Sequence, residues 1–344
     1  MKKIIFFFVI VSYVTLQAAN AQINELDKEK FFEDTSVVNA TITTNMVNID
    51  RRRNKEGAVF PASLQITLKD GTRINDSITI ETRGHFRKGY CSLPPLKINF
   101  KYKKNSYTSP LKDLKLVNRC RGVETGDQYL LKEYLIYKIY NLITDMSFRV
   151  RLLHLNFIDN HHKKKPLEEY AFLMENIKWV AKRNDCKERK DDKMDPRKTN
   201  RLQMATVAIF EYMIGNTDWA VASGHNTKLI VPKIDSSKSP YVVPYDFDYS
   251  GLVGTDYAIP DPKLNISSVY ERLYRGFPKT IEEINTVVDK FKSRKDSIYN
   301  LINHFDLLSP RSKKEMTAYL DDFFSLLNQP EKVKSTFIYN ARTE

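Results

Sequence analysis

The chain has 344 residues and a formal net charge of +13, from 55 Lys and Arg against 42 Asp and Glu. At roughly 100–200 residues per domain, this length predicts one large domain or two closely associated ones. The charge favours acidic partners, the alternative being that it only maintains solubility. Because the cations are scattered and form no named nucleic-acid-binding motif, the sequence disfavours DNA and RNA as partners.

The first 21 residues have the features of a secretory signal peptide. Lys2 and Lys3 form the basic start, an apolar segment runs from Ile4 to Leu16, and Ala19-Asn20-Ala21 is an A-x-A cleavage site. We therefore predict an exported mature chain, periplasmic or secreted, that begins near Gln22. No later segment is apolar for long enough to span a membrane.

A β-rich region is predicted from about Asp27 to Phe100. Apolar and polar residues alternate there and β-branched residues are frequent, which indicates antiparallel strands with one face in water. Asp70-Gly71 and Asn75-Asp76 are the predicted turns. The segment ETRGHFRKGYC places Arg83 among glycines and further cations, so it either binds phosphate or is a solvated basic hairpin.

Lys97 lies between Leu96 and Ile98 in the predicted strand PPLKINF. It either faces water on an alternate position or binds phosphate, as a lysine on strand β3 of kinases does. The helix predicted over 129–147 is mostly core, and its Glu133 is either exposed or paired with Lys97.

The rest of the chain is predicted to be mixed and then helical. Two strands, 148–159 and 167–180, are joined by a basic turn, and the charged stretch 181–200 reads as a mobile loop or a short exposed helix. A helix over 202–214 ends at Gly215, and strands follow on either side of a Ser-rich turn. Helices are predicted over 269–277, after Thr280, and from Pro310 with Ser309 as N-cap.

The mature chain has three cysteines, Cys91, Cys120 and Cys186. In an oxidising compartment this odd number indicates one disulfide and one free thiol, and their spacing does not suit a zinc site. Cys91 and Cys120 flank what reads as strand and loop, so they are the preferred pair.

Two short polar clusters stand at the ends of apolar segments. GNTDWAVASGHN contains Asn216, Asp218 and Asn226, and VVPYDFDYSG contains Asp246 and Asp248. Acids and amides in such places are paired, hydrated or bound to a cation, so we predict a metal and phosphate site built from both turns. The alternative is that Asp218 caps a turn and that Asp246 and Asp248 solvate the end of a strand.

These motifs occur in an order that resembles the spore coat protein H (CotH-like) kinase family, a remote branch of the protein-kinase-like fold. The resemblance spans roughly residues 55 to 260, and its motifs are TRG (82–84), PPLKINF, FLMEN, GNTDW, HN (225–226) and PYDFD (244–248). It implies an α+β fold with two lobes: a β-rich N-terminal lobe (22–175) with one large helix, and a mainly helical C-terminal lobe (176–344). ATP and Mg²⁺ or Mn²⁺ would bind between them.

The resemblance also implies roles for single residues. Asp218 would be the catalytic base, and Asn226 and Asp246 would hold the metal ion. Lys97 and the turn at Arg83 would contact the nucleotide phosphates, and the segment Met174 to Asn176, which includes Glu175, would line the adenine pocket. Asn226 follows Asp218 by eight residues, where kinase catalytic loops commonly space the two by five.

Three functions are therefore predicted as alternatives. The first is an exported atypical kinase that transfers the γ-phosphate of ATP to a protein Ser or Thr or to another hydroxyl-bearing acceptor, acidic ones among them. The second is a catalytically inactive kinase-fold protein that binds or assembles at a surface. The third is a binding module for acidic glycans.

Overall fold

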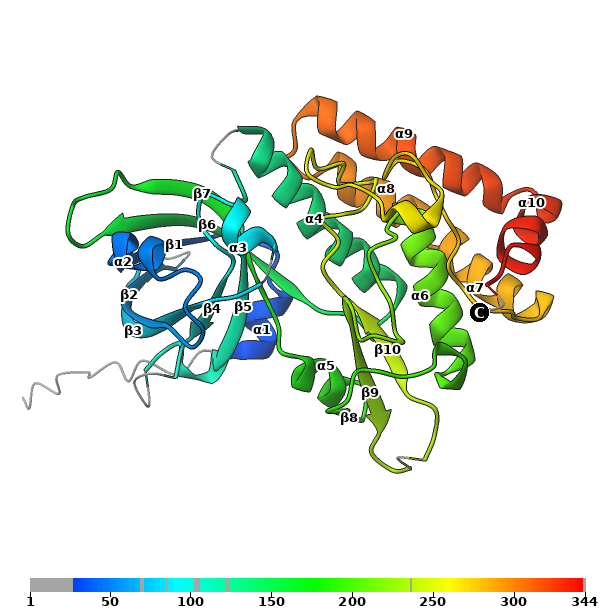
Figure 1. Ribbon diagram of the computed structural model, residues 1–344, viewed down its shortest axis with the longest axis horizontal. Coiled ribbons are helices and arrows are strands. Elements are labelled where there is room, and N and C mark those ends of the chain that lie inside the picture. The colour runs from blue at the N-terminus through cyan, green and yellow to red at the C-terminus, as the bar shows by residue number, and fades with distance from the viewer. Residues whose placement is uncertain are drawn as a thin grey trace, which may run out of the picture.

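The computed structural model describes residues 27–68, 71–84, 86–101, 106–121, 124–235 and 237–342. The predicted signal peptide and Asp70 of the predicted turn lie outside these ranges. A closed seven-stranded β-barrel and a mainly helical C-terminal region make up the fold, which confirms the predicted α+β class (Figure 1). Within the described ranges, no helix combines the length and apolar character that a membrane span requires.

The barrel strands follow the order β1-β2-β3-β4-β5-β7-β6. Their bounds are β1 Val38–Thr44, β2 Val59–Thr67, β3 Arg73–Thr82, β4 Leu96–Asn99, β5 Asp113–Asn118, β6 Val150–Asp159 and β7 Leu167–Met174. The predicted antiparallel pairing holds for all neighbours except β1 and β6, which run parallel and close the barrel. Buried side chains from all seven strands fill its interior.

Two local predictions about the strands need correction. Asn75 and Asp76 do not form a turn but lie inside β3, where they pair with Gln65 and Leu64 of β2. The Asn75 side chain is exposed, whereas Asp76, on the same face as its buried partner Leu64, is half-buried and accepts a hydrogen bond from the backbone N–H of Thr108 at 2.8 Å. The strand β5, with the sequence DLKLVN, was not predicted.

The predicted disulfide between Cys91 and Cys120 is confirmed, and Cys186 is a buried free thiol. The disulfide joins the segment after α3 (Phe86–Tyr90) to the end of β5, and the backbone N–H of Ser92 donates to the carbonyl of Cys120 at 2.8 Å. A disulfide is consistent with the predicted export.

Removing this disulfide is expected to destabilise the protein. The two cysteines are 29 residues apart, so cross-linking them lowers the entropy of the unfolded chain by an amount worth about 3–4 kcal/mol. The double variant Cys91→Ala/Cys120→Ala should lose about this free energy of unfolding in urea titrations, with Cys186→Ala as the control for losing a cysteine. Equal stability of the double variant and the wild type would contradict the expectation.

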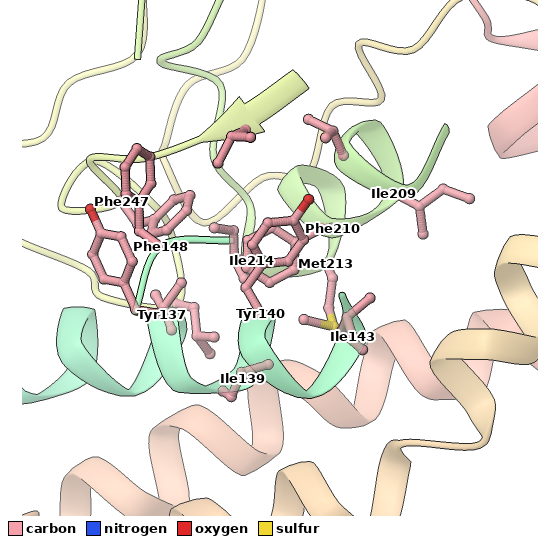
Figure 2. Packing of buried hydrophobic residues seen from close by; sticks show 14 of the residues in the cluster. Tyr137, Ile139, Tyr140, Ile143, Phe148, Ile209, Phe210, Met213, Ile214 and Phe247 are labelled. Carbon is pink, nitrogen blue, oxygen red and sulfur yellow. The ribbon is translucent and has the colours of Figure 1, made fainter. Parts of the chain in front are cut away.

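The helix α4 (Glu124–Ile143) lies between the barrel and the helices of the C-terminal region (Figure 1). Its Tyr140 ring is 4.1 Å from that of Phe210, and its Tyr137 ring is 4.7 Å from that of Phe247, measured between centroids (Figure 2). Because outward side chains of β5, β6 and β7 join the same cluster, these strands are buried on both faces. This cluster, a second hydrophobic core, therefore links the barrel to the helical region.

The remaining elements complete the two regions. Before and within the barrel lie α1 (Lys28–Glu33), α2 (Met46–Arg51) and the 3₁₀ turn η1 (Ser109–Leu111); after it come α5 (Ile177–Arg183), β8 (Cys186–Glu188), η2 (Pro196–Lys198), α6 (Arg201–Ile214), β9 (Thr227–Pro232), β10 (Tyr241–Pro244), η3 (Pro262–Leu264), α7 (Ile281–Lys292), α8 (Lys295–Asn303), α9 (Pro310–Leu327), α10 (Pro330–Lys334) and the π-helical turn η4 (Ser335–Tyr339). Strands β8, β9 and β10 form a separate small sheet.

Several predictions for this region are confirmed and two are wrong. The caps at Gly215 and Ser309 are present, as are the strands β9 and β10. Residues 177–183 form a helix rather than the end of a strand, because the Asn176 side chain caps its first turn. Residues 269–277 contain no helix, since the arginines there bond to carbonyl groups of other segments.

Candidate active site

The loop that follows α6 starts at Gly215, whose left-handed φ of 67° ends the helix. The next residue, Asn216, is 1% exposed and fixes the loop in two directions. Its Nδ2 donates to Oε2 of Glu211 at 2.9 Å, and its Oδ1 accepts from the backbone N–H of Asp218 at 3.0 Å. Burial raises the pKa of Glu211 to about 8. The hydrogen bonds of the buried Asn216 side chain therefore fix the backbone at Asp218 relative to α6.

The eight-residue spacing does not separate Asn226 from Asp218. Ala220 and His225 exchange two backbone hydrogen bonds of 2.9 Å, so the intervening residues form a closed turn that includes Gly224 at a φ of 68°. Nδ2 of Asn226 then donates to the Asp218 carbonyl at 2.7 Å and to Oδ2 at 3.0 Å. Nε2 of His225 lies 2.8 Å from Oδ1 of Asp218. The turn thus places His225 and Asn226 in hydrogen-bonding contact with Asp218, the predicted base.

The hairpin of β9 and β10 brings Asp246 to the same place. Asn226 precedes β9 and Asp246 follows β10, and the two strands are antiparallel, with Thr227 opposite Pro244. The backbone N–H of Tyr245 donates to the Asn226 carbonyl at 3.0 Å, which continues the ladder to the residue before Asp246. Asn226 and Asp246 have positive φ angles of 52° and 69°. Such angles are uncommon outside glycine and cluster at functional sites.

Two cations of the barrel lie near the Asp246 carboxylate. Nε of Arg83 donates to the Leu96 carbonyl at 3.1 Å, which fixes the guanidinium on the barrel. Burial lowers the pKa of Arg83, and the negative charge of Asp246 opposes this shift. Lys115 of β5 has its Nζ 3.9 Å from the centroid of the Tyr245 ring. Burial, with Arg83 nearby, lowers the pKa of Lys115 to about 7, and Asp246 acts in the opposite direction.

Lys97 lies one strand away from this cluster. It stands opposite Lys115 in the register of β4 and β5, its side chain is 39% exposed, and its Nζ is 3.6 Å from Oε2 of Glu81. The predicted pairing of Lys97 with Glu133 is not formed. Glu133 is 3% exposed, and the charges that act on it are those of Asp248, Asp246, Arg87 and Arg83.

Asp248 belongs to a second, buried group of charged residues, which includes Arg87 and Glu133. Nη1 of Arg87 is 3.6 Å from Oδ2 of Asp248, which also accepts a hydrogen bond from the hydroxyl of Tyr257 at 2.8 Å. Burial raises the pKa of Asp248 to about 6, and burial likewise raises the pKa of Glu133. The Asp248 carboxylate therefore binds the Arg87 segment to the DFD segment that follows β10.

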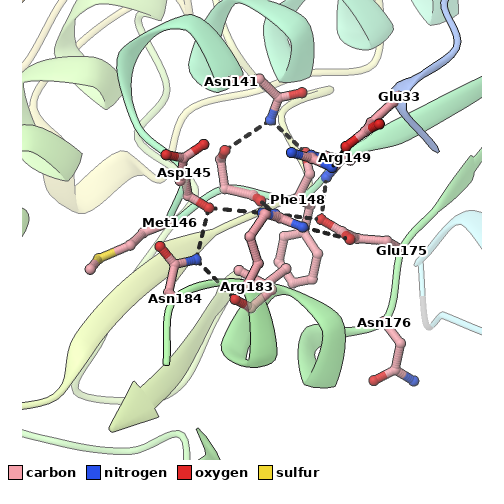
Figure 3. A network of polar contacts seen from close by, with 12 residues as sticks. Glu33, Asn141, Asp145, Met146, Phe148, Arg149, Glu175, Asn176, Arg183 and Asn184 are labelled. Atoms are coloured by element: carbon pink, nitrogen blue, oxygen red, sulfur yellow. Dashed lines mark hydrogen bonds and ion pairs between the residues drawn. The ribbon is translucent and has the colours of Figure 1, made fainter. Parts of the chain in front are cut away.

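Glu175 fastens the connection between the barrel and the helical region (Figure 3). Its carboxylate accepts hydrogen bonds from the backbone N–H of Arg149 at 2.7 Å and from Arg183 at 2.8 and 3.1 Å. Its own backbone N–H donates to the Arg149 carbonyl at 3.1 Å. Asn176 caps α5, and Met174 is buried in β7. Both the carboxylate and the N–H of Glu175 are thus used within the protein.

The donors at the site fit a magnesium or manganese ion that is also held by phosphate. Within the described ranges no hydrogen bond reaches the Asp246 carboxylate or Oδ1 of Asn226, although Nδ2 of the same amide is fully used. Mg²⁺ binds through one or two carboxylates together with substrate phosphates and waters. A group of three or more His, Cys, Asp or Glu arranged for a metal is not found in the described part of the chain. An ion here would therefore need further ligands, such as phosphate oxygens or waters.

The structure gives roles to three residues for which the sequence predicts none. Lys115 lies in LKLV, a pattern almost the same as the LKIN around Lys97, so sequence alone could not choose between them. The sequence predicts no role for His225, which belongs to the HN motif. Asn216 is predicted only as a polar residue of the loop.

Comparison with known proteins adds no family to this description. The chain matches no protein-family model, and a search of curated proteins gives no significant match. The function is therefore argued from the site itself.

If the phosphates of ATP bind beside Lys115, the lowered pKa of this lysine predicts that their binding weakens as the pH rises through 7. A group with a pKa near 7 is about 90% protonated at pH 6 and about 10% at pH 8, so affinity for ATP should fall about tenfold between them. The Lys115→Arg variant keeps its charge and should show a flatter profile. Titrations of Mg·ATP at pH 6, 7 and 8 test this, and identical profiles for both proteins would contradict it.

Proposed function

We propose that the protein is an exported kinase-like phosphotransferase that moves the γ-phosphate of ATP to a protein Ser or Thr or to another hydroxyl-bearing acceptor. The observation that carries this proposal is the gathering of Asp218, Asn226 and Asp246 at one end of the β9–β10 hairpin. Cations of the barrel, Arg83 and Lys115, lie near the same Asp246. Phosphoryl transfer needs a positioned base, ligands for a metal ion and cations for phosphate.

The order of elements supports a two-lobed kinase-like arrangement. Protein kinases place the phosphate-binding lysine on strand β3 and its glutamate partner on the following helix. Here Lys115 lies on β5, the strand directly before α4, and Glu133 lies on α4 itself. Lys115 is therefore better placed than Lys97 for the lysine's role, and the connection at Glu175 stands where a hinge between lobes would be.

The residues of the chain then have distinct tasks. His225 and Asn226 hold the Asp218 carboxylate, which accepts the proton as the acceptor oxygen bonds to the γ-phosphorus and ADP leaves. Asp246 and Asn226 would hold Mg²⁺ or Mn²⁺, which when bound neutralises charge on the phosphates. Arg83 and Lys115 add positive charge from the barrel side.

Binding of Mg·ATP tests the proposal. Ligand at 100 times its Kd stabilises a folded protein by about 2.7 kcal/mol, so the melting temperature should rise with ATP and Mg²⁺ together. ATP with a chelator should have a much smaller effect. A melting temperature that does not respond to ATP with either Mg²⁺ or Mn²⁺ would refute the proposal.

A second function, a kinase-fold binding protein without catalysis, is favoured by one specific observation. Both carboxylate oxygens of Asp218 already accept or share hydrogen bonds with His225 and Asn226. If this state is retained with ATP bound, the protein should be stabilised by Mg·ATP but transfer no labelled phosphate to itself or to added acceptors.

A further inference from the structure

A groove of about 550 Å³ lies directly beside the loop that carries Asp218. Its walls are residues 193–197, residues 219–222 of the loop, and the side chains of Arg275, Phe277 and Arg342. The backbone N–H of Met194 donates to the Val221 carbonyl at 3.2 Å, which fastens the first wall to the loop. Arg275 of the lining donates hydrogen bonds to the carbonyls of Thr217 and Trp219, on either side of Asp218, and the Asp218 charge acts on its guanidinium, so the groove borders the segment that carries the candidate base.

Positive charge dominates the lining of the groove. It contains four cations, Lys193, Arg197, Arg275 and Arg342, against the single carboxylate of Asp195, which gives a formal charge of +3. Asp195 is already paired with Arg197 at 2.9 Å. Burial lowers the pKa of Arg275, and the nearby guanidinium of Arg342 lowers it further. Two guanidinium groups that repel one another gain from an anion bound between them.

The floor of the groove is apolar. The apolar atoms that it presents belong to residues that are half-buried or exposed, namely Met194, Pro196, Ala220 and Ala222. Trp219 is 4% exposed and Phe277 9%. The Arg275 guanidinium carbon lies 5.6 Å from the Trp219 ring, and that of Arg342 lies 5.7 Å from the Phe277 ring. Because the Trp219 ring is covered, its face is not open for stacking on a sugar. A peptide in which an apolar side chain stands between carboxylates would match both the apolar floor and the basic walls. This combination favours a peptide over a glycan as the ligand.

We infer that this groove binds an acidic peptide segment next to the hydroxyl group of the acceptor, an inference that rests on the proposed function. Carboxylates of the peptide pair with the cations of the walls, and an apolar side chain covers the floor. A Ser or Thr hydroxyl beside such a segment is thereby delivered toward Asp218. Like charges exclude basic segments, so the groove selects acceptors flanked by Asp and Glu.

Fluorescence of Trp219 provides a direct test in the full mature chain. The chain has two tryptophans, and Trp179→Phe leaves Trp219 as the only reporter while keeping an aromatic ring against Phe32. A synthetic peptide with Ser and Leu flanked by glutamates should change the emission saturably. Its counterpart with glutamines should bind about tenfold or more weakly, and added salt should weaken the glutamate peptide.

Charge reversal assigns the binding to the groove. Lys193→Glu/Arg342→Glu should weaken binding of the glutamate peptide by at least about tenfold, whereas Lys198→Glu, an exposed residue of the same segment outside the lining, should leave it unchanged. Equal effects of the two variants, equal affinity for both peptides, or preferential binding of a uronic-acid oligosaccharide would overturn the inference.

Melting curves with Mg·ATP on the same samples separate this inference from the proposed function. Peptide binding without any stabilisation by Mg·ATP would refute the kinase proposal and leave the groove as an acidic-peptide site. Stabilisation by Mg·ATP without preference for the acidic peptide would refute the groove assignment alone.

Discussion

Replacing Asp218 with asparagine is expected to slow phosphoryl transfer by about 10²–10⁴-fold, the usual contribution of a general base. The substitution removes the only carboxylate that Asn226 and His225 orient in the loop, so the acceptor hydroxyl loses its proton acceptor. The isosteric amide keeps the shape of the loop, and Mg·ATP affinity should stay close to the wild-type value. Transfer of ³²P from labelled ATP to the protein or to an acidic Ser peptide measures the effect.

Two further variants show whether a loss of transfer is specific to Asp218. Asp296→Asn, at an exposed position of α8, removes a carboxylate elsewhere and should transfer phosphate at the wild-type rate. Asp246→Asn should lose both transfer and Mg·ATP binding, because Asp246 is the proposed carboxylate ligand of the metal ion. Undiminished transfer by Asp218→Asn would show that another group serves as the base.

Replacing Arg183 with alanine is expected to cost about 3–5 kcal/mol of unfolding free energy, as breaking one side of a buried ion pair does. Glu175 is 4% exposed, and Arg183 supplies two of the three hydrogen bonds to its carboxylate. The remaining charge would be buried without its partner. Because this pair joins the barrel to α5, the variant should also misplace the barrel cations relative to Asp246.

The effect of Arg183→Ala should depend on pH in a defined direction. Burial raises the pKa of Glu175 above its ordinary value, and removing Arg183 raises it further. A folded state that holds the proton more tightly than the unfolded state loses stability as the pH rises through that pKa. Urea titrations should therefore show a larger deficit at pH 8 than at pH 5.

Matched variants identify the cause of this deficit. Lys182→Ala removes an exposed neighbour and should have little effect. Glu175→Gln/Arg183→Ala should recover part of the loss, since no charge is left buried. A stability within about 1 kcal/mol of the wild type for Arg183→Ala at both pH values would contradict the buried-pair interpretation.

The fold could be predicted where local pattern decides the structure. Alternating strands, the glycine cap at Gly215 and the N-cap at Ser309 depend on neighbouring residues, and all three are present. Residues 269–277 have apolar spacing compatible with a helix, yet Arg272 and Arg275 bond to carbonyls of Met213, Thr217 and Trp219. Such contacts depend on distant segments, which the local pattern does not contain.

The site shows the same division between local and distant information. GNTDW, HN and DFD were identified from their composition, and the structure brings Asp218, Asn226 and Asp246 together. The choice between Lys97 and Lys115 depends on which barrel strand lies beside β7 and the helical region, a property of strand order. The use of Glu175 in an ion pair depends on α5, a helix capped by Asn176 where the sequence pattern predicts the end of a strand.

Calorimetric titration of Mg·ATP into the full mature chain tests the central claim most directly, because that claim is that Asp246 and Asn226 hold a metal ion together with the phosphates of ATP. We expect one binding site per wild-type chain in the presence of Mg²⁺, and no detectable binding heat for a folded Asp246→Ala variant. Absence of binding by the wild type, or undiminished binding by Asp246→Ala, would contradict the assignment of this cluster as a nucleotide and metal site.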